Sequence, residues 1–173
     1  MASKETKDRF EKLCIACDAV EKAGGKPADI RIPLRELFIF DLQRFFMYLS
    51  ASDGRVLPEE AEYMNGLFGA DHSVNEYVKR IDESRIYSVD FENDLPFSLK
   101  IAALAEQRFG GLTDEDGNEL SGLSTQIFEL YREAGIEFLG CDKDVNERES
   151  NDLGMYLARK RMQLQQLLGG DDE

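Results

Sequence analysis

The sequence predicts an all-α fold with about seven helices in a single compact domain over residues 1–173. Apolar residues recur every three or four positions almost throughout the chain, which is the period of a helix with one buried face. Residues that start and stop helices bracket these segments. No segment keeps the alternating pattern of a strand. With 173 residues, 42% of them apolar, the chain is long enough to bury a sizeable core.

In chain order the predicted helices cover residues 4–23, 33–50, 58–68, 74–81, 94–109, 124–140 and 146–168. The first stops at a glycine pair, so residues 1–32 are expected to be an N-terminal helix and its linker. Proline suits the first turn of a helix, and Pro33 and Pro58 therefore mark the next two starts.

Local signals define the later segments. Ser73 and Glu76 have the spacing of a capping box at the start of the fourth helix. Residues 86–89 are ambiguous between helix and strand, and residues 112–123 form a predicted polar loop. Residues 169–173 are expected to be a disordered acidic tail.

The composition excludes several classes of function. Lysine and arginine number 21 against 35 aspartates and glutamates, a net charge of −14, so we expect no nucleic-acid binding. No apolar run approaches the roughly 20 residues that span a bilayer, and the N-terminus has no apolar signal core. We therefore expect no direct membrane insertion. Three cysteines are not a disulfide framework, and together these features predict a cytoplasmic protein.

Cys14 and Cys17 form a C-x-x-C motif on the apolar side of the first helix. We interpret both as buried structural thiols, because a redox pair would need a strand-to-helix junction that lowers a thiol pKa. A zinc site made of both thiols with Cys141 and His72 has the right residue types, but no second C-x-x-C supports it.

The pattern Asp-x-x-Val-x-x-x-Glu occurs twice, at residues 53–60 and 142–149. Each copy follows a long apolar helix and precedes an amphipathic one. The repeat predicts two helix-loop-helix halves that cover each other's apolar faces. Val56 and Val145 are expected to enter the core, while the two final glutamates lie in a first helical turn, where a carboxylate stabilises by about 0.3–1 kcal/mol.

These loops carry a family resemblance. The stretches 48–62 and 138–149 resemble the loops of the tellurite-resistance TerB-like domain family, with Asp-Gly, a hydrophobic residue two places on and a glutamate pair opening a helix. That family is all-helical and has two similar halves. The second loop departs from the pattern, because Lys143 replaces glycine. The resemblance implies a bacterial stress-response or tellurite-associated role, divalent-cation binding, and an ATPase or membrane-associated complex as partner.

Carboxylates around these loops are candidate ligands for Ca²⁺, Mg²⁺ or Mn²⁺, which prefer oxygen donors. The candidates are Asp53, Glu60, Asp142, Asp144 and Glu149. Residues 142–146 begin like a calcium loop, but Glu147 and Leu153 occupy the positions of its glycine and final glutamate, so this is no EF-hand. The alternative is that the carboxylates only cap helices and keep the chain soluble.

Three charged residues fall on apolar helix faces. We expect Asp41 to be buried and satisfied inside the fold, with Arg108 as one candidate partner. A less favoured alternative is that Asp41 is functional and lines a groove. The stem of Lys160 is expected to cover apolar surface while its ammonium reaches water.

Nothing in the sequence indicates catalysis, since His72 stands alone and there is no phosphate loop or dinucleotide motif. We therefore expect a non-enzymatic binding protein. The first hypothesis is a stress-response protein whose acidic loops hold a divalent cation. The alternative is a protein–protein interaction module that docks on an ATPase or a membrane-associated stress complex.

Overall fold

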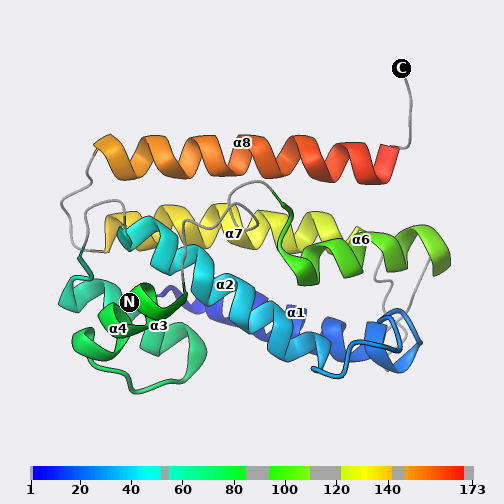
Figure 1. Ribbon diagram of the computed structural model, residues 1–173, viewed down its shortest axis with the longest axis horizontal. Helices are drawn as coiled ribbons and strands as arrows, with labels where there is room; N and C mark the ends of the chain where they lie inside the picture. The colour runs from blue at the N-terminus through cyan, green and yellow to red at the C-terminus, as the bar shows by residue number, and fades with distance from the viewer. Residues whose placement is uncertain (1, 52–54, 85–93, 110–121, 142–146, 170–173) are drawn as a thin grey trace.

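The computed structural model describes residues 2–51, 55–84, 94–109, 122–141 and 147–169. These residues form seven helices and no strand, which confirms the all-α prediction (Figure 1). The helices are α1 (Lys4–Lys22), α2 (Leu34–Ala51), α3 (Pro58–Phe68), α4 (Val74–Ser84), α6 (Phe97–Phe109), α7 (Leu123–Gly140) and α8 (Glu147–Gly169).

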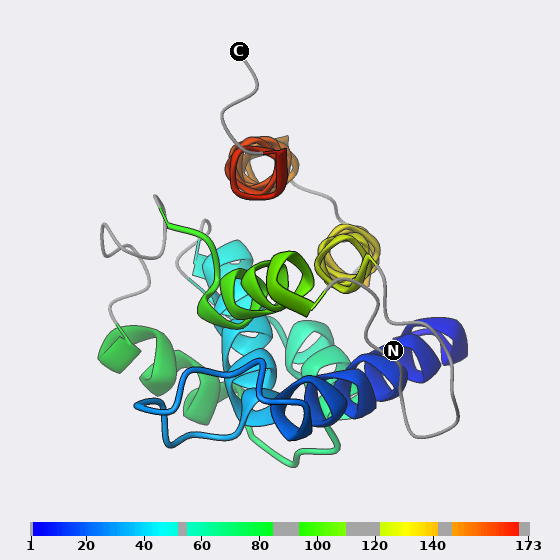
Figure 2. The ribbon, with the colours of Figure 1, turned by 90° about the vertical axis from the view of Figure 1, so that its right-hand side faces the viewer.

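Helix α2 is the centre of the arrangement, because it packs against α1, α3, α4, α6, α7 and α8. Helices α3 and α4 cover one end of α2, and α1 crosses beneath it (Figure 1). Figure 2, which looks along α7 and α8, shows α8 as the outermost helix, with α6 and α7 between it and α1. None of the described helices is long and apolar enough to cross a membrane.

Two adjacent phenylalanines of α2, Phe45 and Phe46, are fully buried at the centre of the core. The centres of their rings lie 4.9–5.5 Å from those of Tyr63, Tyr131, Phe138 and Tyr156, on three other helices. Gly135 lets α7 approach these rings, since a Cβ there would lie 2.8 Å from Leu153 Cδ1 and 3.0 Å from Phe45 Cζ. Aromatic packing of this kind contributes beyond the buried area alone.

Glutamate side chains of one helix accept hydrogen bonds from first-turn groups of another helix. Glu21 of α1 accepts a hydrogen bond from the Leu34 N–H at the start of α2, at 2.6 Å. Glu106 of α6 accepts from the N–H and Oγ of Ser124 at the start of α7, at 2.5 and 2.8 Å. The first N–H groups of a helix have no partner within it and carry its positive dipole end. These two glutamates therefore link α1 to α2 and α6 to α7.

The predicted C-terminal end of α3 and the predicted start of α4 are confirmed, whereas α4 continues to Ser84, beyond the predicted residue 81. Gly69 ends α3 with φ +64°, a left-handed conformation that favours glycine. The capping box at α4 has both hydrogen bonds, from Ser73 N–H to Glu76 Oε2 at 2.7 Å and from Glu76 N–H to Ser73 Oγ at 3.2 Å. Helix α6 begins at Phe97 rather than near residue 94, because a residue that precedes proline is disfavoured in a helix.

Three expectations from the sequence are wrong. Arg108 is exposed at the end of α6, because the buried side of that helix is formed by Leu99, Ile101 and small alanines instead of Leu104. Lys160 is only 1% exposed, so its ammonium does not reach water. Gly169 belongs to α8 rather than to a tail, since the helical hydrogen bonds continue through it.

The two predicted helix-loop-helix halves correspond to α2–α3 and α7–α8. Their second helices differ in length, with 11 residues in α3 and 23 in α8. Val56 is buried, as predicted, at the turn before α3. Residues 86–89, 112–121, 170–173 and the second valine, Val145, lie outside the described residues.

Candidate functional site

The proposed cation ligands are only partly visible. Those that lie outside the described residues are Asp53, Asp142, Asp144 and the side chain of Glu149. Glu60 is 3% exposed, and its Oε2 accepts a hydrogen bond from the Leu57 N–H at 2.9 Å. It therefore caps α3, as the alternative reading expects. The described residues contain no group of three or more His, Cys, Asp or Glu that could hold a metal ion.

The buried-thiol interpretation of Cys14 and Cys17 is confirmed, since both side chains are buried in α1. Burial raises the pKa of Cys14 to about 11, and it also raises the pKa of Cys17. Both thiols stay protonated at neutral pH, which is the opposite of what a redox pair needs. Cys141 lies at the end of α7 and His72 between α3 and α4, and the described residues show no zinc site that combines them.

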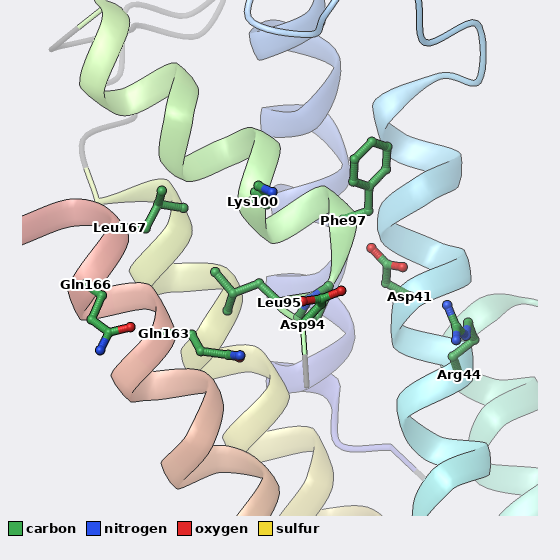
Figure 3. Close-up of a pocket in the computed structure, with 10 residues that line it drawn as sticks. Asp41, Arg44, Asp94, Leu95, Phe97, Lys100, Gln163, Gln166 and Leu167 are labelled. Atoms are coloured by element: carbon green, nitrogen blue, oxygen red, sulfur yellow. The ribbon is translucent and has the colours of Figure 1, made fainter. Parts of the chain in front are cut away.

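A groove lies between α2, the start of α6 and α8 (Figure 3). Its volume is about 680 Å³, within the range of small-molecule and cofactor sites. The lining combines apolar and charged side chains from parts of the chain that are distant in sequence. The lining residues are Asp41, Arg44, Asp94, Leu95, Pro96, Phe97, Lys100, Gln163, Gln166 and Leu167.

Asp41 forms one wall of the groove and is 5% exposed. Its Oδ2 accepts hydrogen bonds from the N–H of Ser98 at 2.9 Å and from the Ser98 Oγ at 2.7 Å. The expectation that Asp41 is satisfied inside the fold is therefore confirmed, and Ser98 is the partner in place of Arg108. Asp41 also lines the groove, while a functional role for it stays a prediction. Burial raises the pKa of Asp41, while the two Ser98 hydrogen bonds and the charge of Arg44 lower it in part.

The basic groups of the groove come from two helices. Arg44 lies one turn beyond Asp41 on α2, with its guanidinium carbon 5.7 Å from the centre of the Phe40 ring. Lys100 is exposed on the first turn of α6, and Figure 3 shows it on the same side of the groove as Phe97. Asp94 balances one of these charges, so the groove is close to neutral in a chain at −14.

Lys160 fixes the segment that precedes α6. Its ammonium donates a hydrogen bond to the backbone carbonyl of Asp94 and lies 5.2 Å from the centre of the Tyr156 ring. Because Lys160 belongs to α8, this bond joins the far wall of the groove to the segment of Asp94 and Leu95. The shape of the groove therefore depends on a buried lysine.

Sequence reasoning identified Asp41 and Lys160 as unusual but did not place them at one site. The signal was a charge at the centre of an apolar stripe on each helix. Nothing in the sequence indicated that Gln163 and Gln166 line the groove, because glutamine is common on exposed helix faces.

No family model matches this chain, and neither a curated protein nor a solved structure is significantly similar to it. The fold and the groove together define an all-helical protein with a mixed apolar and charged cleft.

Proposed function

We propose that this protein acts by non-covalent binding in the cytoplasm, and that the groove between α2, α6 and α8 receives a short segment of a partner protein. The main support for the proposal is the size and lining of the groove. A cavity of about 680 Å³ with apolar walls and a few fixed polar groups is typical of binding sites. Lys100 and Asp94 are exposed at its edge and offer ion pairs to a peptide.

Two buried hydrogen-bonded contacts in the walls of the groove support this proposal. Ser98 donates to Asp41, and Lys160 donates to the backbone carbonyl of Asp94, so both walls are linked to neighbouring helices. A site that is already ordered loses less conformational entropy on binding. Leu95, Phe97 and Leu167 offer apolar surface for one or two side chains of the partner segment.

Selection from a random peptide display library on the immobilised full-length chain tests the proposal. Enriched peptides should lose at least ten-fold in affinity when Phe97→Ser or Lys100→Glu is introduced. Leu104→Ser and Lys12→Glu are matched controls, because both residues are exposed and lie outside the groove. Enriched peptides that bind all four variants equally, or a selection without any enrichment, would contradict the proposal.

The TerB-like resemblance supports a second proposal, in which the loops around residues 53 and 142 hold a divalent cation as part of a stress response. Each loop joins two helices, which is the arrangement that the resemblance implies. Because Glu60 already caps α3, we propose that the cation is bound mainly by Asp53, Asp142, Asp144 and Glu149.

A further inference from the structure

The two sides of α8 differ in chemistry. Its inner side is buried against the rest of the molecule through Leu153, Tyr156, Lys160 and Leu164. Its outer side carries Met155 and Met162, each 63% exposed. These are the largest exposures among the described large hydrophobic residues. Figures 1 and 2 show no described helix over this outer side.

Part of the exposed side of α8 has heptad spacing. Residues 151, 155, 158, 162 and 165 are exposed and are separated by four, three, four and three positions, the spacing of a and d positions in a coiled coil. Because residues 151 and 165 are Asn and Gln, the apolar part of this seam consists of Met155, Ala158 and Met162. With Met155 and Met162 at a, Ala158 lies at d between them. The two methionines lie about 10.5 Å apart along the helix axis. A partner helix could therefore insert its own side chains on either side of Ala158.

Two arginines flank the seam between Met155 and Met162, whereas Asp152 occupies the e position one heptad earlier. In the same register Arg159 occupies an e position and Arg161 a g position, where coiled coils place the charges that select a partner. Residues 154–169 contain no aspartate or glutamate, although the whole chain has a net charge of −14. The C-terminal part of α8 is thus a basic region on an acidic protein.

We infer that the outer face of α8, formed by Met155, Ala158, Met162, Arg159 and Arg161, docks an amphipathic helix of another protein that carries apolar a and d residues and acidic e and g residues. Charge complementarity selects this occupant, since the arginines attract carboxylates. A second copy of the chain is a poor occupant, because two bodies of charge −14 repel each other. Methionine is flexible and polarizable, so the face can adapt to different apolar partners.

This surface shares no a or d residue with the groove. From α8 the groove is lined by Gln163, Gln166 and Leu167, none of which lies on the a/d seam, although Gln166 is exposed and occupies an e position beside it. One helix therefore contributes to two neighbouring sites. The protein would then bridge two partners.

A designed pair of helical peptides of about three heptads tests the inference. Both peptides carry leucine at a and d, and they carry either glutamate or lysine at every e and g position. Fluorescence anisotropy on the full-length chain should show at least ten-fold tighter binding of the glutamate peptide. Met162→Glu should weaken that binding at least ten-fold, and Arg161→Glu should shift the preference toward the lysine peptide.

Two controls make the result specific. Ile15→Glu places the same charge at another exposed apolar residue, on α1, and should leave binding unchanged. Lys100→Glu alters the groove and should also leave it unchanged, which separates this inference from the proposed function. Equal binding of both peptides, or binding insensitive to Met162→Glu, would overturn the inference. Sedimentation that shows a dimer lost in Met162→Glu would overturn it too, because the occupant would then be a second copy.

Discussion

Both hydrogen bonds that Ser98 donates, from its backbone N–H and from its Oγ, end on a single oxygen of Asp41, at 2.9 and 2.7 Å. This contact joins the middle of α2 to the first turn of α6 and caps α6 from another helix. Because Asp41 also lines the groove, the capping contact and the wall of the candidate site are the same structure.

Replacement of Asp41 separates the capping role from the charge. Asp41→Ala should lower the free energy of unfolding by about 1–3 kcal/mol, because the buried N–H and Oγ of Ser98 lose their acceptor. Asp41→Asn should cost less, since an amide oxygen still accepts. Urea denaturation measures both values, and Asp94→Asn, an exposed neighbour, is the control. Equal losses for Ala and Asn would show that the charge matters more than the acceptor.

The acid limb of the stability curve should reflect opposite shifts of two pKa values. The hydrogen bond from the Leu34 N–H, with a smaller contribution from Lys26, holds the pKa of Glu21 below its usual range. Its stabilisation is therefore present above the unfolded pKa of about 4.3 and is lost as pH falls through the folded value. Glu21→Gln should flatten this acid-induced loss in urea melts between about pH 2 and pH 6.

Asp41 should behave in the opposite way, because burial raises the pKa of this carboxyl. A raised pKa means that the folded state binds the proton more tightly, so the contribution is present below the unfolded pKa of about 3.9 and is lost as pH rises through the folded value. The stability difference between wild type and Asp41→Asn should therefore change with pH in the sense opposite to that of Glu21→Gln. A parallel change in both variants would refute the assignment.

Lys160 should contribute to stability although its charge is buried. Lys160→Ala removes a side chain that is 1% exposed and takes away a donor to the Asp94 carbonyl, with an expected loss of about 2–4 kcal/mol. Arg161→Ala, one residue further and exposed, should change stability by less than about 0.5 kcal/mol. Thermal or urea unfolding of both variants gives the comparison. If Lys160→Ala is as stable as wild type, the hydrogen bond from Lys160 does not hold the segment at Asp94 in place.

The cysteines should alkylate in order of burial. With a pKa of about 11, only about one Cys14 thiol in a thousand is ionised at pH 8, and its side chain is buried. Half-buried Cys141 should react first with iodoacetamide, while Cys14 and Cys17 should react only after unfolding. Peptide mass spectrometry at successive times gives the three rates. Rapid modification of Cys17 in the native protein would point to opening of α1.

Divalent cations should stabilise the protein if the loops bind them. Ca²⁺, Mg²⁺ or Mn²⁺ should raise the melting temperature by mass action, by the equivalent of about 2.7 kcal/mol at one hundred times the dissociation constant. Asp53→Asn or Asp142→Asn should abolish the rise, and Glu59→Gln, an exposed carboxylate in the first turn of α3, should not. A melting temperature that none of the three ions changes would refute the cation proposal.

Helix positions could be predicted from the sequence because their determinants are local. Apolar spacing, the prolines before α2 and α3, Gly69 and the Ser73–Glu76 pair each act within a few residues of the helix that they define. The burial of Cys14 and Cys17 followed from the same spacing.

The groove and the buried polar contacts depended on the tertiary structure. The partner of Asp41 lies 57 residues away, and the carbonyl bound by Lys160 lies 66 residues away. The prediction that Arg108 lies on the buried face of α6 was wrong. The pattern took the larger apolar residues of α6 as its buried face, whereas the structure buries alanines, which allow close packing against the neighbouring helices. By itself the sequence determined where helices form and which faces are apolar. Which faces meet was decided by the packing of the whole chain, because hydrophobic attraction has no direction and polar partners are selected only once helices are in contact.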